Sequence, residues 1–181
     1  MTNWKQLIAV SAAVSLVTAV AVAEQQRKSV KNTLTAADFV EIQQLVNKYA
    51  DAIDNCTNNG YDYATLYTED GYFAPFQNGK VGTKFQGRER LAEAAGGGVK
   101  GCTDKLAVPE DKRSRHVYVN LVITPTDKGA SGSVDLLVAG KDGNRNYFEI
   151  QGHYEDVYAR TPAGWRFASR EHHVPSDFRR R

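Results

Sequence analysis

The sequence feature that most constrains the fold is a change in hydrophobic periodicity near Arg115. Upstream of this residue, apolar side chains recur at helical spacing. Downstream, apolar and polar side chains alternate with the period of two that is typical of strands. Helices followed by an antiparallel meander predict an α+β domain, with the helices packed on one face of a curved sheet. The expected strands are 115–124, 131–139, 146–160 and 164–173, with turns at 126–129, 141–144 and 161–164.

A long amphipathic helix is expected to begin after Thr35 and to end near Asp54. Thr35 is a suitable N-cap residue, and Asp38 three residues later can complete a capping box. Apolar side chains then recur at the spacing that one buried helix face requires. They are Phe39, Ile42, Leu45, Val46, Tyr49 and Ile53.

Shorter elements are expected between this helix and the meander. A second helix is predicted over 61–67, closed by a turn at Asp70-Gly71, and a first strand at 72–76. A third helix is predicted over 87–95. Gly96-Gly97-Gly98 then either stops that helix or acts as the hinge of a lid. The segment lacks the pattern of a phosphate loop, because no strand precedes it and no Lys-Ser/Thr follows in register.

The first 23 residues have the pattern of an export signal. Lys5 supplies a positive charge, an apolar run follows, and Ala21-Val22-Ala23 fits the small-x-small cleavage pattern. The alternative is a membrane anchor, because the run approaches the lower length limit for a spanning helix. Cleavage is favoured, since a polar segment follows directly, and it would leave a periplasmic or secreted protein without a stable anchor. The predicted organisation is a signal over 1–23, a flexible lead-in over 24–34, one domain over 35–175 and a basic tail over 176–181.

Export gives the two cysteines a structural interpretation. In an oxidising compartment, Cys56 and Cys102 most simply form one disulfide. The alternatives are a reactive thiol or half of a metal site, and no CxxC motif or Cys/His cluster supports either.

The charge balance argues against a polyanionic partner. Lys and Arg number 23 against 21 Asp and Glu, which gives a formal net charge of +2. Nucleic-acid binders that neutralise phosphates carry a much larger basic excess. The only basic run is Arg179-Arg180-Arg181, for which a solvated terminus is the simpler explanation. With 41% hydrophobic residues, the chain has the composition of a globular domain. Because the charge balance argues against nucleic acid, the expected partner is a small molecule.

The order and spacing of several motifs resemble one superfamily over roughly 35–173. This is the SnoaL-like branch of the nuclear transport factor 2-like fold, a cone of curved sheet and helices around a hydrophobic pocket. The motifs are the helix from Ile42 through Tyr49 to Asp54, the segment 66–71, Gly87-Arg88 opening a helix, His116 with Asn120 on a strand, and the closing hairpin 152–158 with 164–167.

Within the superfamily, the catalytic pattern is most similar to scytalone dehydratase, bile-acid dehydratase and hexachlorocyclohexane dehydrochlorinase. These enzymes carry an Asp at the end of the first helix and a His at the start of a pocket strand. The matching positions are Asp54 and His116, and Tyr49 matches the polar helix residue that accompanies the Asp. The resemblance implies catalysis without a cofactor and a homodimer or homotrimer. Because polyketide cyclases, steroid isomerases and epoxide hydrolases share the fold, the fold alone does not name the reaction.

Asp54 is also unusual on physical grounds. A carboxylate at the C-terminal end of a helix faces the negative end of the helix dipole, and a cationic partner would offset that cost. We expect Asp54 to orient His116 and stabilise its protonated form, so that His116 acts as a general base. The alternative is that Asp54 only solvates the following loop and His116 is an ordinary strand residue.

Other polar residues are candidates for substrate binding. Strict alternation places Tyr118 and Asn120 on the same face as His116, a mixture that suits a ligand cavity or a solvent face. Tyr49 lies among apolar helix positions, so its hydroxyl is either a donor to a developing oxyanion or a satisfied core group. Asp135, an acid in an apolar strand, is either a second pocket carboxylate or an outward, solvated residue.

The remaining histidines do not predict a metal site. His172 and His173 are adjacent on a strand and point to opposite faces, so they cannot easily share one ion. Spacings such as HxxxH or HxH, which would place His153 or another histidine beside a partner, are absent.

The sequence therefore predicts a cofactor-independent lyase acting on a small apolar or aromatic molecule. His116 would remove a proton, Asp54 would stabilise it, and Tyr49 with Asn120 would polarise an oxygen of the substrate. An isomerase could use the same residues. The alternatives from other classes are a periplasmic binding protein for an apolar ligand and a structural module that assembles through the open face of its sheet.

Overall fold

The computed structural model describes residues 33–77, 79–142 and 145–174. The predicted signal over 1–23, nearly all of the lead-in and the basic tail lie outside the described residues. Every element below belongs to one compact unit, Leu34–Arg181.

The first described helix, α2 (Ala36–Asn55), begins and ends as the sequence indicated. The Thr35 hydroxyl accepts the backbone N–H of Asp38, and the Asp38 carboxylate accepts the N–H of Thr35, which completes the capping box. Asp38 is buried and also accepts a bond from the indole N–H of Trp165 at 3.0 Å. Because this carboxylate lies at the positive end of the helix dipole, the contact ties the start of α2 to the sheet favourably.

Several short elements connect α2 to the meander, and two expectations about them were wrong. The second helix is only one turn long, and Asp70-Gly71 lies inside a strand rather than in a turn. The third helix is confirmed, and the glycines after it stop it: a side chain at Gly97 would collide with the carbonyl oxygen of Asn59. In chain order, with η for 3₁₀ helices, the elements are η1 (Thr57–Gly60), α3 (Tyr61–Ala64), β1 (Tyr67–Gln77), β2 (Lys80–Val81), β3 (Phe85–Gln86), α4 (Arg88–Ala94), η2 (Gly98–Lys100), α5 (Thr103–Ala107) and η3 (Glu110–Lys112).

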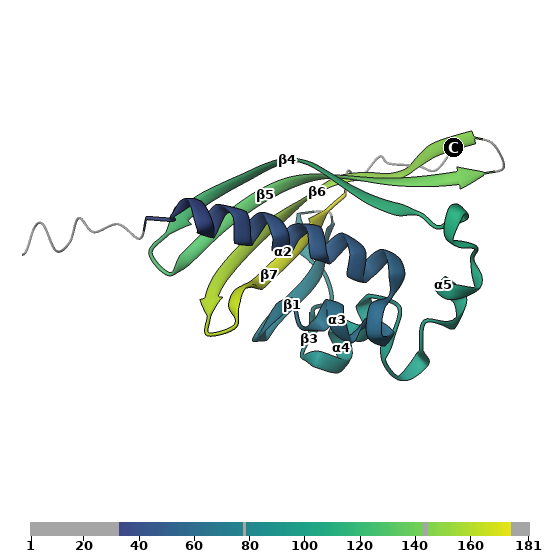
Figure 1. The fold of residues 1–181 in the computed structure, drawn as a ribbon, viewed down its shortest axis with the longest axis horizontal. Coiled ribbons are helices and arrows are strands. Elements are labelled where there is room, and N and C mark those ends of the chain that lie inside the picture. Colours follow the sequence, from purple (N-terminus) through teal and green to yellow (C-terminus); the bar gives the residue numbers. More distant parts are fainter. Residues whose placement is uncertain (1–32, 78, 143–144, 175–181) are drawn as a thin grey trace, which may run out of the picture. The chain divides into compact units, whose positions relative to one another are not determined.

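The meander consists of four long strands that pair consecutively and antiparallel. They are β4 (Arg115–Thr126), β5 (Gly129–Asp142), β6 (Arg145–Thr161) and β7 (Gly164–His173), close to the predicted ranges. β1 pairs with β7 in parallel, which gives the sheet order β2-β1-β7-β6-β5-β4, with β3 paired to β1. The sheet is curved and does not close, and α2 runs across one of its faces (Figure 1). The predicted α+β class is therefore confirmed.

The face of the sheet that α2 covers, here called the inner face, contains the core. Each strand sends alternate side chains into this core, and the opposite side chains form an outer face. The core includes Ile42, Val46 and Tyr49 of α2, Val134 and Leu136 of β5, Tyr154 and Tyr158 of β6, and Trp165 and Phe167 of β7.

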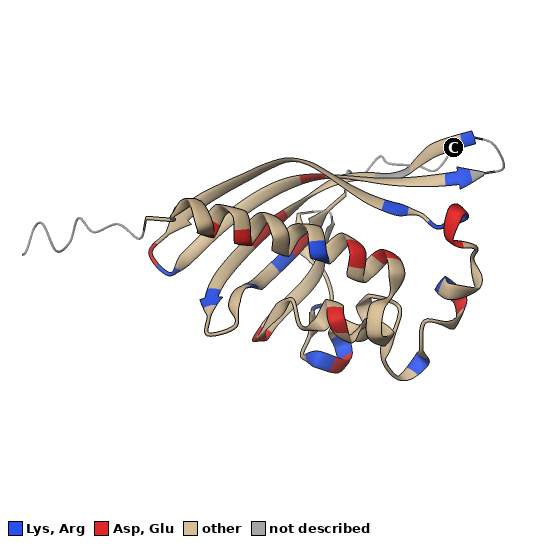
Figure 2. Ribbon diagram, in the orientation of Figure 1, with Lys and Arg blue, Asp and Glu red and all other residues tan. Residues whose placement is uncertain are grey.

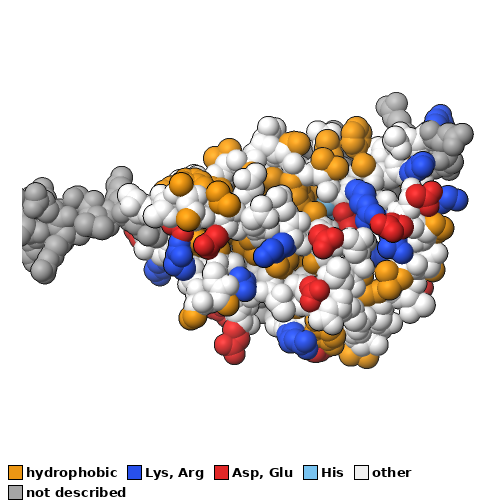
Figure 3. Space-filling model, in the orientation of Figure 1, with side chains coloured by type: hydrophobic (Ala, Val, Ile, Leu, Met, Phe, Trp, Pro, Cys, Tyr) orange, Lys and Arg blue, Asp and Glu red, His pale blue; other side chains and the backbone are white. Residues whose placement is uncertain are grey.

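Charges of both signs are spread over the described surface. Figure 2 shows Lys and Arg interspersed with Asp and Glu along the helices and strands, and Figure 3 shows the same mixture between hydrophobic side chains on one face. This distribution agrees with the near-neutral net charge. Within the described ranges, no helix combines the length and hydrophobicity needed to cross a membrane.

Candidate active site

Asp54 and His116, 62 residues apart in the sequence, are in direct contact. The Oδ1 atom of Asp54 lies 2.5 Å from Nδ1 of His116, and Oδ2 accepts the backbone N–H of His116 at 2.9 Å. Asp54 is buried, whereas the His116 side chain keeps 17% of its surface exposed. The structure thus brings together the two residues that the sequence singled out, at the interface between α2 and β4.

The end of α2 is held in place by two further contacts. Cys56 caps the helix in the left-handed conformation (φ 50°) and is disulfide-bonded to Cys102, as predicted. Lys105 donates from Nζ to the carbonyl oxygen of Ile53 and thereby places a cation at the negative end of the helix dipole. Burial lowers the pKa of Lys105, and the charge of Asp54 opposes that shift.

The contact assigns the roles of the two imidazole nitrogens. A carboxylate can only accept, so the nitrogen facing Asp54 carries the proton. In the neutral ring, Nε2 of His116 is then the unprotonated nitrogen and is available as a base. When Nε2 takes up a proton, the adjacent carboxylate stabilises the resulting imidazolium.

Tyr49 is fully buried and belongs to a chain of hydroxyl groups. Tyr63 donates to the Tyr49 oxygen at 3.3 Å, and the Tyr63 and Tyr67 oxygens are 2.9 Å apart. Burial raises the pKa of all three phenols well above its ordinary value, so they remain protonated. Tyr49 therefore has a hydrogen-bonded hydroxyl inside the core. This agrees with the second interpretation of Tyr49 given above, a core residue whose hydroxyl is satisfied.

Tyr118 differs from these tyrosines because its hydroxyl is buried and finds no hydrogen-bond partner among the described residues. Its ring centroid lies 6.3 Å from that of His116 and 6.1 Å from that of Tyr49. Burial raises the pKa of this phenol as well, which keeps it a proton donor. An unpaired buried hydroxyl costs about 1–3 kcal/mol, so this group is available for a ligand at that cost.

Deeper inside the inner face lies a buried ion pair that sequence reasoning missed. Arg170 donates from Nε and Nη2 to the two oxygens of Asp156, each at 2.8 Å, and both side chains are fully buried. Tyr158 donates a third bond to Asp156 at 2.7 Å. Although burial alone favours the neutral form, the paired carboxylate raises the pKa of Arg170, so the guanidinium stays charged.

The guanidinium of Arg170 is enclosed by aromatic rings. Its central carbon lies 4.1 Å from the ring centroid of Tyr49, 4.3 Å from those of Tyr154 and Phe167, and 5.6 Å from that of Tyr118. Its third nitrogen, Nη1, is buried and has no hydrogen-bond partner among the described residues. Arg170 therefore offers one free donor on the side of the sheet where Tyr118 and His116 lie.

His172 completes this set of inner polar groups. Its ring packs 4.9 Å from that of Tyr154, and its Nε2 atom is buried without a hydrogen-bond partner in the described ranges. Burial, together with the nearby imidazole of His116 and guanidinium of Arg170, lowers the pKa of His172 to about 4. The ring is therefore neutral at neutral pH.

The predicted shared face of β4 was wrong from Asn120 onward. The pairing of β4 with β5 shifts by one residue between Val119 and Val122, and Asn120 adopts φ 57°. This β-bulge reverses the alternation, so Asn120 turns outward and donates to Asp135 at 2.9 Å on the exposed outer face. Asn120 and Asp135 therefore lie on the face of the sheet opposite to His116. For Asp135, the structure agrees with the interpretation as an outward, solvated residue and not with that of a pocket carboxylate.

The residue pattern of β6 contains a partial indication of the buried ion pair between Asp156 and Arg170. Asp156 has the same parity as Tyr154 and Tyr158, which marks an acid on an otherwise apolar strand face. Such an acid requires a cationic partner when it is buried. The opposite strand of the hairpin supplies that partner, because Asp156 and Arg170 are direct cross-strand neighbours.

Two surface hollows lie away from this cluster. One of about 700 Å³ is lined by α2 and the turn before β7, and one of about 490 Å³ lies on the outer face of the sheet. Neither is lined by Asp54 or His116. Of the two residues in contact, His116 is the one that solvent reaches, with 17% of its side chain exposed against 6% for Asp54.

A family model described as a SnoaL-like domain matches residues 34–171. No curated protein matches the sequence significantly. Among solved structures, an NTF2-like protein with a cystatin-like fold from Novosphingobium aromaticivorans is 20% identical, with a TM-score of 0.64 over 87% of this chain and 90% of that one.

Two further solved structures show the same fold. ActVI-ORFA from Streptomyces coelicolor is 17% identical, with a TM-score of 0.60 over 80% of this chain and 100% of that one. A protein from Catenulispora acidiphila, solved in complex with S-DNPA, is 23% identical, with a TM-score of 0.57 over 76% of this chain and 95% of that one. The match to the family model covers most of the chain, and the chain belongs to the SnoaL-like family of the nuclear transport factor 2-like fold.

Proposed function

We propose that the protein is a cofactor-independent lyase that eliminates a small group from an apolar or aromatic small molecule. The observation that carries the proposal is the contact between Asp54 and His116, which leaves Nε2 of His116 free to act as a general base. Family membership supports a small-molecule enzyme of this kind, since the family includes polyketide cyclases and dehydratases.

The proposed step needs one base and one acid. Nε2 of His116 takes a proton from a substrate carbon, and the electron pair of that C–H bond forms a new double bond to the neighbouring carbon. The leaving group departs from that neighbour with its bonding electrons. Asp54 stabilises the imidazolium that forms. In a dehydration, the departing hydroxide takes that proton from His116 and leaves as water. A leaving group that departs as a stable anion takes no proton, and His116 then gives its proton to solvent.

Two inner groups support the charge that develops on the substrate. The Tyr118 hydroxyl and the Nη1 atom of Arg170 are buried donors without partners among the described residues, which is the property required of an oxyanion or leaving-group site. Tyr49 packs against both side chains and orients them. The ring of Tyr118, whose centroid lies 6.3 Å from that of His116, favours an apolar or aromatic substrate, because flat apolar groups pack well against such a ring.

We further propose that the protein acts outside the cytoplasm. The disulfide between Cys56 and Cys102 in the described structure supports an oxidising compartment. The segment 1–23 supports export through its apolar run and its cleavage pattern.

The test is a screen of the purified protein, treated with EDTA, against phenylpropanoid, steroid and terpenoid compounds that carry a leaving group next to an acidic C–H bond. A lyase produces a conjugated product that is detected by its ultraviolet absorbance and by the loss of mass. His116→Ala should abolish that signal. An isomerase would instead yield a product of unchanged mass, with one deuterium incorporated when the reaction is run in D₂O.

A binding protein would give a different result. It would retain its ligand chemically unchanged, and neutralising Asp54 would leave the affinity unaltered. Tight binding without turnover across the panel, with equal affinities for the wild type and Asp54→Asn, would reject the lyase proposal.

A further inference from the structure

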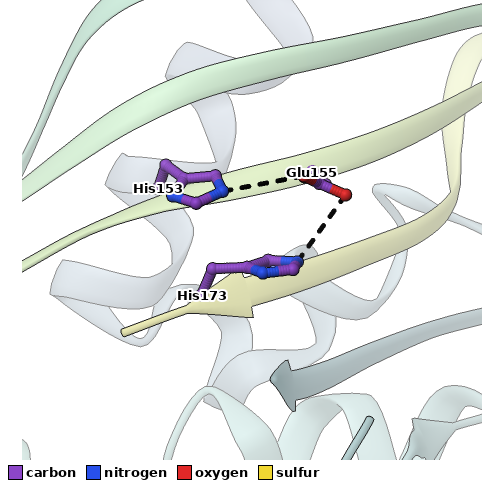
Figure 4. Close-up of side chains that lie close together, drawn as sticks. All are labelled: His153, Glu155 and His173. Carbon is purple, nitrogen blue, oxygen red and sulfur yellow. Dashed lines mark ion pairs between the residues drawn. The ribbon is translucent and has the colours of Figure 1, made fainter. Parts of the chain in front are cut away.

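Two histidines and a glutamate meet on the outer face of the sheet, opposite the inner site. His153 and Glu155 lie on β6 and His173 on β7, and all three are close together in Figure 4. Nε2 of His153 lies 3.7 Å from one carboxylate oxygen of Glu155, and Nε2 of His173 lies 3.7 Å from the other. One potential ligand atom from each of the three side chains, a ring nitrogen or a carboxylate oxygen, lies within 4.8 Å of the other two.

Cross-strand pairing produces this cluster. His153 and His173 are direct partners in the β6–β7 ladder, and their rings stack with centroids 4.7 Å apart and an interplanar angle of 19°. Nε2 of each ring is the nitrogen directed toward Glu155 (Figure 4). Tyr154, between His153 and Glu155, points instead into the core, so the cluster lies on the opposite face of the sheet from His116.

The surroundings of His173 restrict its orientation. Its ring stacks on Phe76 of β1 at 4.1 Å, and Nε2 is buried without a hydrogen-bond partner among the described residues. Buried polar atoms are nearly always paired, so an unpaired imidazole nitrogen that faces a carboxylate requires an explanation. Glu171 lies next to this nitrogen: its Oε2 is 4.0 Å away, and its Oε1 accepts the Tyr72 hydroxyl at 2.8 Å.

From this arrangement we propose that His153, Glu155 and His173 bind one divalent transition-metal ion, with zinc as the expected occupant. Two imidazole nitrogens and a carboxylate oxygen are a donor set that suits zinc, and Glu171 or water can supply the fourth position. With zinc–ligand distances of about 2.0–2.2 Å, neighbouring donors in a tetrahedral site lie roughly 3.3 Å apart. The two separations of 3.7 Å involve different oxygens of Glu155, and the three ligand atoms span up to 4.8 Å. One imidazole must therefore turn out of the stack and move inward for both rings to reach one ion.

The proposed site is separate from the proposed lyase chemistry. It faces away from the inner groups and joins β6 to β7, so a bound ion would cross-link the two strands. Binding to the folded chain alone then raises the free energy of unfolding by an amount that grows with the logarithm of the zinc concentration relative to the dissociation constant. This effect is independent of any substrate, so the proposal can be tested without knowing the reaction.

The test is isothermal titration calorimetry of ZnCl₂ into EDTA-stripped protein that carries no histidine tag. The wild type is expected to bind one ion per chain with a dissociation constant in the micromolar range or below, and a zinc-dependent rise in melting temperature should accompany binding. His153→Gln and Glu155→Gln should each weaken binding at least about tenfold, because each removes one ligand. Both side chains are well exposed (40% and 61%), so these changes should leave folding intact.

Two matched variants serve as controls. Glu69→Gln changes an exposed carboxylate elsewhere, on β1, and His116→Gln changes the imidazole on the other face of the sheet. Both should bind zinc as the wild type does. The proposal is overturned if the wild type binds no zinc in this range, if the His153 and Glu155 variants bind it normally, or if His116→Gln abolishes the binding.

Discussion

Asp54 contacts His116 at two points, through the imidazole Nδ1 and through the backbone N–H. The second bond fixes the start of β4 against the end of α2, so the carboxylate positions the strand as well as the ring. One side chain therefore combines a structural role with the chemical role proposed for it. The two roles can be separated by substitutions that preserve shape.

Asp54→Asn should retain the fold but lose turnover. The amide oxygen of the new side chain can still accept the backbone N–H of His116, but its NH₂ group would then face Nδ1 and favour the tautomer that is protonated on Nε2. We expect kcat/KM to fall by about 10²–10⁴-fold, the usual range for losing a positioned general base. Steady-state kinetics and circular dichroism test this, with Asp51→Asn, an exposed position one turn earlier on α2, as the control. Wild-type rates in Asp54→Asn would refute the role of the dyad.

Tyr118→Phe should separate activity from stability. The hydroxyl that it removes has no hydrogen-bond partner among the described residues, so its loss should leave the free energy of unfolding unchanged or slightly higher. If the hydroxyl polarises the substrate, kcat should fall by about 10–10³-fold. Tyr63→Phe is the matched control, because it breaks the hydroxyl chain between Tyr49 and Tyr67 and should cost about 1 kcal/mol of stability. A Tyr118→Phe variant with full activity would remove Tyr118 from the site.

Arg170→Met should destabilise the fold strongly. It leaves the Asp156 carboxylate buried without its cation, and breaking a buried pair in this way costs about 3–5 kcal/mol. The double variant Arg170→Met, Asp156→Leu should recover much of that loss, because no unpaired charge remains. Urea unfolding of the three proteins measures both values. A loss below about 1 kcal/mol in the single variant would mean that the pair is not buried as described.

The sequence predicted the elements well and the register of the strands poorly. Capping at Thr35 and the alternation after Arg115 are local signals, and both are confirmed. The contact between Asp54 and His116 was predicted through the family resemblance, which carries information about distant pairings that periodicity lacks. Asn120 was misplaced because a single bulge in β4 reverses which face each later residue occupies.

A second bulge decides which histidine of β7 joins the outer cluster, whose members are neighbours across two strands rather than along one. The turn at 161–164 alone would pair residues whose numbers add to 325, which places His172 opposite His153. The structure instead shifts the register by one residue after the Tyr158–Phe167 pair, so that His173 faces His153 and Arg170 faces Asp156. An irregularity of this kind has no reliable signature in a single sequence, since it depends on how the whole sheet curves.

Removing the disulfide should destabilise the protein without changing its fold. The cross-link between Cys56 and Cys102 spans 46 residues, and constraining a loop of that size in the unfolded chain is worth about 4 kcal/mol. The Cys56→Ser, Cys102→Ser variant should therefore unfold at a lower urea concentration. Wild-type protein in dithiothreitol should behave in the same way, and a midpoint that is unchanged in both would show that the bridge contributes no stability.

His172 should make the stability depend on pH in a defined window. Burial lowers its pKa in the folded chain to about 4, against 6.5 when it is unperturbed. Between these values the unfolded chain binds a proton that the folded chain does not, so the free energy of unfolding falls as the pH drops from about 6.5 to about 4. From about pH 7 to about pH 4.5 this residue alone accounts for a loss of about 2 kcal/mol. His172→Gln should show a correspondingly shallower decline in urea unfolding at the two pH values, whereas His153→Gln, which changes a more exposed ring on the outer face, should follow the wild type. Parallel declines in the wild type and His172→Gln would show that the buried imidazole does not control the acid sensitivity.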